Sequence, residues 1–326
     1  MQHPIPDNIR PAFPVSVPRK DIPAKFRELI GLDQIPQKAE FWVTKTTQEE
    51  ELTVTQVRFP NYLGEIISAT LMWPSAATEP LAGVVCMNGT ASNADQVAHP
   101  RFYRPKPDSG PLYGWGRELT RRGYAVLTFT PKGAERRRKT LKQWEQEARL
   151  LIPFGRSQIG VLADEVLRVS LILGAFDQVD SGRIGLTGMS LGGWGAWLGM
   201  ATGSWIRTAA LVCGGLGSLH TNIYKGMVER HSSFSYIPHM LRYFDHADLV
   251  ATSLAPRPLM MVAPTEDQDM PKEGVDELIR VVTPVYKAAG HPERFKVYQV
   301  PGKHLFKFEY FDWVVEWLDR YLAPDA

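Results

Sequence analysis

The pentapeptide Gly188-Met189-Ser190-Leu191-Gly192 constrains the fold of this chain more than any other stretch. Residues 183–187 before it have the apolar character of a short buried strand, and residues 193–200 after it are typical of the opening of a helix. A G-x-S-x-G sequence between a strand and a helix forms a tight, strained turn that holds the serine hydroxyl above the sheet edge. The glycines permit close backbone packing around that turn. Ser190 is therefore the candidate nucleophile, at a helix N-terminus that offers unpaired N–H groups to a developing negative charge.

The rest of the chain predicts an α/β architecture around this turn. Two runs with strand-like alternation, residues 52–59 and 65–73, flank the turn-forming sequence Asn61-Tyr62-Leu63-Gly64 and indicate an antiparallel hairpin. Apolar strand-like runs then alternate with helical segments, which is typical of a mostly parallel sheet with helices on both faces. We expect strands over residues 82–87, 124–130, 183–187, 208–213, 258–263 and 295–300. We expect helices over residues 24–30, 112–122, 141–176 with a break near 153–155, 272–289 and 310–322, and directly after Ser190.

The composition of the first residues suggests how the chain is divided. The first forty residues are rich in proline and hold too little apolar material for a core of their own. We therefore expect residues 1–45 to form an arm that lies against one α/β domain of residues 46–326. No internal repeat or low-complexity segment interrupts that domain.

Residues 214–251 break the alternation of strands and helices and are rich in histidine and aromatic side chains, including Phe234 and Tyr236. Insertions of this kind usually lie over the carboxyl edge of the sheet, where open α/β folds bind ligands. Two interpretations remain open: a lid that faces the substrate, or a surface insertion whose aromatic side chains pack down on the body. Trp194 is expected to pack within the helix after the turn rather than to contact a substrate.

The charge balance excludes one class of partner. The formal net charge is +2, which gives no reason to propose a nucleic-acid partner. The one basic run, Arg136-Arg137-Arg138-Lys139, has Arg121, Arg122 and Lys132 nearby and is compatible with an anion patch. A solvated helix start or loop is the favoured interpretation of this run.

The cysteines and the hydropathy of the chain indicate in which cellular compartment the protein is expected. Cys86 and Cys213 each lie in an apolar strand-like run and are expected as free, buried thiols, which fits a reducing compartment. The first residues have neither the charged segment nor the apolar segment of a signal peptide, and no apolar run approaches the length of a membrane span. We therefore expect a cytoplasmic protein with no membrane partner, and nothing in these residues specifies an oligomeric state.

A serine hydroxyl needs an adjacent base to act as a nucleophile at neutral pH. Among the eight histidines, His304 is the best placed, because it directly follows the last predicted strand and so lies at the same sheet edge as Ser190. Gly302 is small and lets the loop approach that edge. His304 is therefore the candidate base.

The base in turn needs a carboxylate that orients it and stabilises the imidazolium. Three acidic residues, Glu266, Asp267 and Asp269, follow the strand expected over residues 258–263. Asp267 is favoured because it falls in the first turn beyond the strand, four residues before Pro271. Asp269 is the main alternative and Glu266 the third. At least one of the remaining acids is expected to cap the helix that begins near Pro271.

The order Ser190, Asp267, His304 is that of one known class of serine hydrolases and differs from the chymotrypsin and subtilisin orders. Acyl transfer also needs two N–H donors for the oxyanion. We expect the first donor to be the backbone N–H of Leu191, directly after the nucleophile, and the second to be that of Thr90, in the loop after the strand at residues 82–87. The sequence Asn88-Gly89 stands in that loop where His-Gly is usual.

With these residues in place, the chain resembles the α/β-hydrolase superfamily, and more narrowly its dienelactone-hydrolase and acetyl-xylan-esterase-like branches, over residues 52–322. The matching segments are residues 188–193, 255–259, 236–249, 132–136 and 302–306, together with Asp267 and Pro271. The resemblance implies an α/β-hydrolase fold and a serine hydrolase that cleaves small carboxylic esters without metal or cofactor. A dienelactone hydrolase proper would carry cysteine as nucleophile, so Ser190 favours ordinary ester hydrolysis.

Two other functions are weighed against the esterase. A peptidase or amidase of the prolyl-oligopeptidase type is disfavoured, because the roughly eighty residues before the core are too few for a propeller domain. A non-catalytic ligand-binding protein with a retired triad is disfavoured because Ser190, Asp267 and His304 are all present at suitable spacing.

Overall fold

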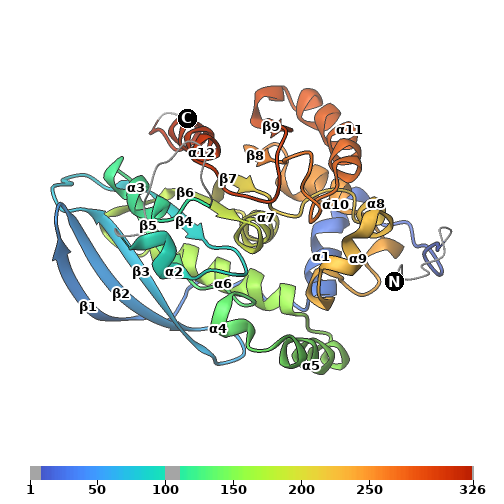
Figure 1. Ribbon diagram of the computed structural model, residues 1–326, viewed down its shortest axis with the longest axis horizontal. Helices are drawn as coiled ribbons and strands as arrows, with labels where there is room; N and C mark the ends of the chain where they lie inside the picture. Colours follow the sequence, from blue (N-terminus) through green and yellow to red (C-terminus); the bar gives the residue numbers. More distant parts are fainter. Residues whose placement is uncertain (1–8, 100–110, 325–326) are drawn as a thin grey trace.

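The alternation of apolar strands and helices folds into one mixed sheet with helices on both faces (Figure 1). The computed structural model describes residues 9–99 and 111–324, so Pro4 and Pro6 of the proline-rich segment lie outside the described residues. Within this part of the chain, nine strands are joined in the order β1-β2-β3-β5-β4-β6-β7-β8-β9. The strands are β1 (Trp42–Glu49), β2 (Leu52–Pro60), β3 (Ile66–Pro74), β4 (Leu81–Met87), β5 (Ala125–Phe129), β6 (Val179–Met189), β7 (Ile206–Val212), β8 (Leu259–Val262) and β9 (Phe295–Tyr298). Strands β1, β2, β3 and β5 pair antiparallel, and the remaining pairs are parallel, which confirms the predicted sheet.

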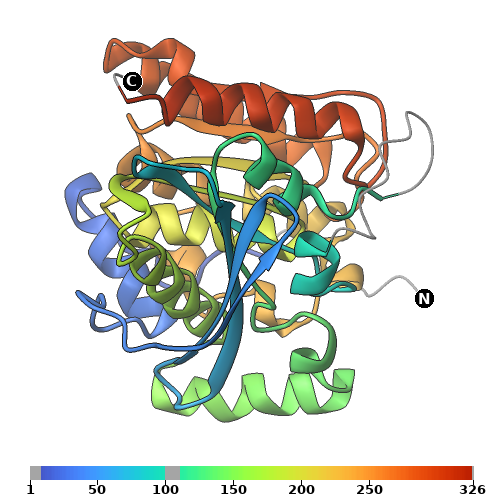
Figure 2. The same cartoon turned by 90° about the vertical axis from the view of Figure 1, so that its left-hand side faces the viewer.

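Helices pack against both faces of the sheet, because successive side chains of each strand point to opposite faces. The larger helices are α1 (Ile22–Ile30), α3 (Trp115–Arg121), α5 (Leu141–Leu151), α6 (Gln158–Leu173), α7 (Leu191–Thr202), α11 (Lys272–Ala288) and α12 (Phe308–Tyr321). Val84 of β4 packs in the cluster that contains α3 and α12, whereas its neighbour Val85 packs in the cluster of α1, α6, α7 and α11. Figure 2 shows α12 and α5 at opposite sides of the molecule.

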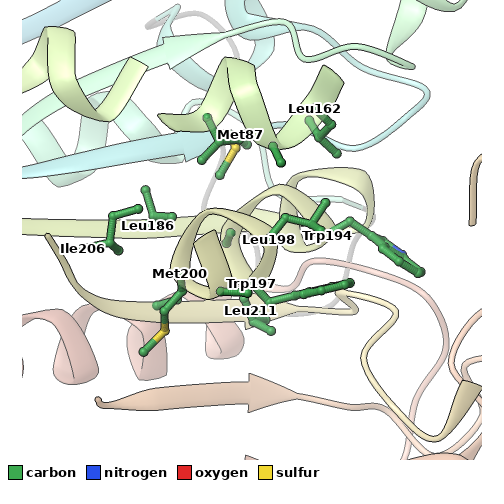
Figure 3. Close-up of a cluster of buried hydrophobic side chains, with 14 of the residues drawn as sticks. Met87, Leu162, Leu186, Trp194, Trp197, Leu198, Met200, Ile206 and Leu211 are labelled. Carbon is green, nitrogen blue, oxygen red and sulfur yellow. The ribbon is translucent and has the colours of Figure 1, made fainter. Parts of the chain in front are cut away.

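Helix α7 is buried along its whole length, because apolar residues occupy every side of it and several glycines let neighbouring elements approach. A Cβ on Gly199 would lie 2.6 Å from a methyl carbon of Val166 on α6, so only glycine fits at this contact. Figure 3 shows Trp194, Trp197, Leu198 and Met200 of α7 among side chains of α6 and of strands β4, β6 and β7. The helix that follows the candidate nucleophile is thus fixed in the centre of the fold.

The predicted hairpin is confirmed, and one further strand had not been predicted. The side-chain oxygen of Asn61 accepts hydrogen bonds from the backbone N–H groups of Leu63 and Glu65, both at 3.0 Å, and this closes the turn between β2 and β3. Strand β1 pairs with β2 at the edge of the sheet. It is almost entirely exposed, so no apolar face marks it in the sequence.

The expected helix break near residue 153 is also confirmed. Helix α5 ends at Leu151, a 3₁₀ turn spans Ile152–Phe154, and α6 begins after Ser157, whose hydroxyl accepts a hydrogen bond from the N–H of Gly160 at 3.1 Å. Pro153 lies within this 3₁₀ turn, because proline cannot continue the preceding helix.

Residues 214–251 contain only short helical pieces, with no strand among them. The α-helical pieces are α8 (Leu219–Asn222), α9 (Val228–Arg230) and α10 (His246–Leu249). Phe244 packs in the core, where its ring lies 6.5 Å from that of Phe26 on α1. Part of this insertion therefore packs down on the body, and helix α1 of the proline-rich segment packs with it. The division into an arm of residues 1–45 and a domain of residues 46–326 stays a prediction.

Two smaller helices lie near the carboxyl ends of the strands: α2 (Ala94–Ala98) after β4 and α4 (Glu135–Arg138) after β5. In the described part of the chain, no helix is both long enough and apolar enough to traverse a bilayer.

Candidate active site

Ser190 lies between β6 and α7 in a backbone conformation that side chains rarely adopt, with φ 55° and ψ −116°. A Cβ on Gly188 would lie 2.5 Å from the carbonyl carbon of Gly192, and one on Gly192 would overlap the carbonyl oxygen of Met87. The N–H of Ser190 donates to the carbonyl of Val212 at 2.9 Å, which ties the turn to the end of β7. The two glycines are thus required by the close approach of three backbone segments.

Asp267 and His304 meet at the same edge of the sheet, from the loops after β8 and β9. The N–H of Glu266 donates to the carbonyl of Gly302 at 2.9 Å and joins the two loops. The Nδ1 of His304 lies 2.8 Å from Oδ2 and 2.9 Å from Oδ1 of Asp267. The Asp267 carboxylate is buried, whereas a quarter of the His304 side chain is exposed. This is the contact that a base and its orienting carboxylate would make.

Asp269, the main alternative, lies farther from the histidine. Its Oδ2 is 3.7 Å from Nδ1 of His304, and its Oδ1 is 2.5 Å from Nε of Arg230 on α9. Its backbone N–H donates to Oδ1 of Asp267 at 2.9 Å, so it helps to hold the nearer carboxylate. Glu266, the third candidate, is exposed.

The expected capping of the next helix by one of these acids is wrong. Helix α11 begins after Pro271 without any side-chain hydrogen bond at its N-cap. Asp269 is instead drawn to Arg230, which comes from the insertion at residues 214–251 and which the sequence alone does not connect to this loop.

One cavity of about 490 Å³ is lined by both Ser190 and His304, together with Leu191 and Thr90. No hydrogen bond joins Ser190 to His304 in the described structure; such contacts are often long before a substrate binds. Aromatic side chains form much of the wall; they are Tyr113, Trp115, Trp144, Trp194, Phe234 and Phe306. The cavity thus combines a polar end at the strand edge with an apolar wall suited to a small organic ligand.

Leu191 and Thr90, the residues expected to supply the oxyanion donors, both line this cavity. Within the described residues, the backbone N–H groups of Leu191 and Thr90 have no hydrogen-bond acceptor. A Cβ on Gly89 would lie 3.4 Å from Cβ of Ser190, so the loop after β4 passes directly beside the serine. Asn88, which replaces the usual histidine, donates from its side-chain amide to the carbonyls of Gly89 and Ser92 at 2.8 and 2.7 Å. It therefore holds this loop in shape.

The surroundings of His304 raise its pKa. Burial by itself lowers the pKa of His304, but the hydrogen bond and negative charge of Asp267, assisted by Asp269, outweigh it, so the pKa is raised above 6.5. His231, which also lines the cavity, has its pKa lowered by burial, against the opposing influence of Asp269.

A cluster of possible metal-ligating atoms is formed by Cys213, Asp267 and His304, which lie within 4.8 Å of one another. Burial, with the nearby charge of Asp267, raises the pKa of the Cys213 thiol well above 9, whereas metal binding needs the thiolate. His304 already shares its Nδ1 with Asp267. Two members of this cluster, Asp267 and His304, are thus already paired with each other.

Several residues of the cavity were not predicted from the sequence. Trp194 packs 5.2 Å from Trp197 as expected, yet it also lines the cavity. Phe234 of the insertion, which the lid interpretation names, does line the cavity, whereas Tyr236 does not. Arg138 lines it as well, and its signal in the sequence was the basic run that we interpreted as a solvated segment.

Comparison with known proteins agrees with this architecture. Residues 225–319 match a family model described as "Abhydrolase family" (Abhydrolase_7). "Putative hydrolase YtaP" of Bacillus subtilis (strain 168) is 28% identical over 188 residues, which is 57% of this chain and 61% of that protein, less than two thirds of its length.

Two solved structures extend the comparison to nearly the whole chain. A glucuronoyl esterase from Solibacter usitatus has a TM-score of 0.72 at 15% identity, over 98% of this chain and 100% of that chain. A "putative acetyl xylan esterase" from Bacteroides fragilis NCTC 9343 has a TM-score of 0.70 at 17% identity, over 93% of this chain and 86% of that chain. At such identities the likeness establishes the fold, and the chain has the α/β-hydrolase fold.

Proposed function

We propose that this chain, an α/β-hydrolase by fold, is a serine esterase that cleaves carboxylic esters of small molecules through an acyl-enzyme intermediate. The observation that carries the proposal is the pairing of His304 with the buried Asp267, since His304 and Ser190 line the same cavity. The similarity of the fold to two structures described as esterases supports the same reaction class.

In the proposed first half-reaction, Oγ of Ser190 attacks the ester carbonyl carbon while Nε2 of His304 takes the hydroxyl proton. The carbonyl oxygen becomes an oxyanion, which accepts hydrogen bonds from the N–H groups of Leu191 and Thr90. The imidazolium is stabilised by Asp267. It then gives its proton to the departing alkoxide, so the alcohol leaves and the acyl group stays on Ser190.

In the second half-reaction, water attacks the acyl carbon and His304 accepts its proton. The second oxyanion collapses, the Ser190–acyl bond breaks, and His304 returns the proton to the serine oxygen. The products are a carboxylic acid and an alcohol, and no cofactor is consumed.

The remaining expectations are proposals of the same kind. We propose that residues 46–326 form the catalytic domain, with residues 1–45 as an arm and residues 214–251 as a lid-like insertion. Cys86 and Cys213 are free and buried, which supports a reducing, cytoplasmic location.

Fluorophosphonate labelling of the purified protein tests the nucleophile without knowledge of the substrate. We expect an adduct on Ser190 that is absent from Ser190→Ala and retained in Ser232→Ala, which alters another serine lining the cavity. Hydrolysis of 4-nitrophenyl acetate should follow the same pattern. A folded protein that gives neither an adduct nor turnover would favour the non-catalytic ligand-binding protein instead.

A further inference from the structure

The basic run at residues 136–139 separates, in the structure, into residues with quite different surroundings. Lys132, just before the run, is buried, and its Nζ lies 2.7 Å from Glu65 and 2.6 Å from Glu147. Arg137 pairs with the buried carboxylate of Glu165 at 2.6 Å. The prediction of a solvated segment is therefore wrong for Lys132 and Arg137, because acidic residues from distant parts of the chain surround them.

Arg121 and Arg122, the two arginines near the run that could have extended an anion patch, are also paired. Arg121 lies 2.8 Å from Glu50 and 2.7 Å from Glu51, and Arg122 lies 3.5 Å from Glu118. Arg121, Arg122, Lys132 and Arg137 are thus already neutralised and do not contribute to an extended anion patch.

Arg138 differs from them. Arg138 lines the same cavity as Ser190, and among the described residues it has no carboxylate partner and no side-chain hydrogen bond. The cavity wall also contains Arg230 and Asp269, but these two neutralise each other at 2.5 Å. Among the arginine and acidic residues of the described wall, Arg138 therefore carries the uncompensated positive charge, in the cavity that Ser190 also lines.

The backbone that supplies Arg138 is fixed relative to the reacting groups. The N–H of Glu135, at the start of α4, donates to the carbonyl of Thr90 at 2.9 Å and so links α4 to the loop of the expected oxyanion donor. Arg137 reaches Glu165 with both terminal nitrogens, at 2.8 and 2.6 Å, and Glu165 also accepts from the N–H of Lys132 at 2.9 Å. These contacts anchor the segment on α6, and Arg138 of this segment lines the cavity.

From this arrangement we infer that Arg138 is a specificity-determining residue, which binds a carboxylate that the ester substrate carries in addition to its ester group. This inference rests on the proposed esterase function. A guanidinium offers a planar fork of N–H donors that matches a carboxylate and is less strongly hydrated than an ammonium. Inside a partly enclosed cavity the attraction is stronger than in open solvent.

The neighbouring aromatic side chains extend the description of the substrate. Trp144 packs with its ring centroid 6.1 Å from Phe234, and both line the cavity with Arg138. A flat apolar group between the ester and the carboxylate would contact this wall. Carboxy-substituted aromatic esters therefore fit the site and serve as probes.

Two matched substrate pairs test the inference on either side of the ester bond. The first is 3-acetoxybenzoate against 3-acetoxybenzamide, and the second is 4-nitrophenyl 4-carboxybenzoate against 4-nitrophenyl 4-carbamoylbenzoate. The quantity measured is the ratio of kcat/KM for the anionic ester to that for its neutral amide partner, after division by the rates of hydroxide-catalysed hydrolysis.

We expect the wild-type ratio to exceed one in at least one pair and to fall about tenfold in Arg138→Gln, because a charge-assisted hydrogen bond is lost. Arg138→Lys should retain part of the preference. Lys139→Gln removes a charge from an exposed residue outside the cavity wall and should leave the ratio unchanged. Sodium chloride at 0.5 M should reduce the wild-type ratio. Because a ratio is compared, a uniform loss of folded enzyme cannot imitate the effect.

A wild-type preference that persists in Arg138→Gln, or the absence of any preference in both pairs, would overturn the inference. These outcomes differ from a failure of the proposed function, in which the neutral esters are not hydrolysed and fluorophosphonate does not label Ser190.

Discussion

Replacing Asp267 by asparagine isolates the carboxylate that the proposed mechanism places behind His304. The carboxylate is buried, with its nearer oxygen 2.8 Å from Nδ1 of the histidine. When His304 takes the serine proton it becomes a cation, and at an effective dielectric constant of about 20 a unit negative charge at this separation stabilises it by about 6 kcal/mol. Since about 1.4 kcal/mol corresponds to a factor of ten, kcat of Asp267→Asn should fall by roughly four powers of ten.

Asp269→Asn is the matched control, because Asp269 is the alternative carboxylate. Its nearer oxygen is 3.7 Å from Nδ1 of His304, the side chain is partly exposed, and Arg230 already pairs with its other oxygen. At the dielectric constant of water, a unit charge at this distance contributes about 1 kcal/mol, so kcat should fall only about sixfold.

The assay is the steady-state hydrolysis of 4-nitrophenyl acetate at pH 8, with thermal melting to verify that both variants fold. The reasoning fails if Asp267→Asn keeps kcat within tenfold of the wild type. It also fails if Asp269→Asn is the more damaged variant, which would make Asp269 the orienting acid.

Three further changes should have measurable effects. Phe234→Ala should change the ratio of KM for 4-nitrophenyl hexanoate to that for the acetate by about fivefold, since about 1 kcal/mol of aromatic contact is lost; Tyr236→Phe, outside the cavity wall, should leave the ratio unchanged. The value of kcat/KM should fall as the pH is lowered through the pKa of His304, which lies above 6.5, because the protonated imidazole cannot accept the serine proton. Equal activity at pH 5 and pH 8 would contradict the base assignment. Glu165→Gln removes the fully buried carboxylate from Arg137, which keeps Glu65 at 3.0 Å, and should lower the free energy of unfolding by about 1–3 kcal/mol. With an unfolding entropy of roughly 2.1 cal/mol/K per residue over 326 residues, Tm should drop by about 1.5–4 °C, and calorimetry showing less than 1 °C would contradict this view.

Much of the fold could be predicted because its elements carry their own periodicity. Residues 82–87 are apolar throughout, as a strand covered on both faces must be, and β4 spans Leu81–Met87. Strand β1 could not be predicted in this way, because its residues are exposed at the sheet edge and show no apolar face. This edge strand is held by its backbone hydrogen bonds to β2 rather than by burial of its own side chains.

In the candidate site, too, some residues could be predicted from the sequence and others could not. Ser190, Asp267 and His304 each follow a strand of the parallel part of the sheet, so topology alone brings them to one edge. The difference between Asp267 and Asp269 depends on a loop conformation and on Arg230, which lies about forty positions earlier in the chain. The surroundings of Lys132 and Arg137 likewise depend on Glu165, which reaches them only after α6 has packed.

The two buried thiols have a practical consequence for measuring motion in this protein. Cys86 lies in the middle of the sheet and Cys213 at the end of β7, beside Asp267, and burial raises the pKa of both thiols well above 9. Each is therefore slow to react with an alkylating reagent until its surroundings open. Their alkylation rates under native conditions would therefore measure how often the structure around each thiol opens. Faster modification of Cys213 than of Cys86 would report local opening of the site, whereas equal rates would report global unfolding.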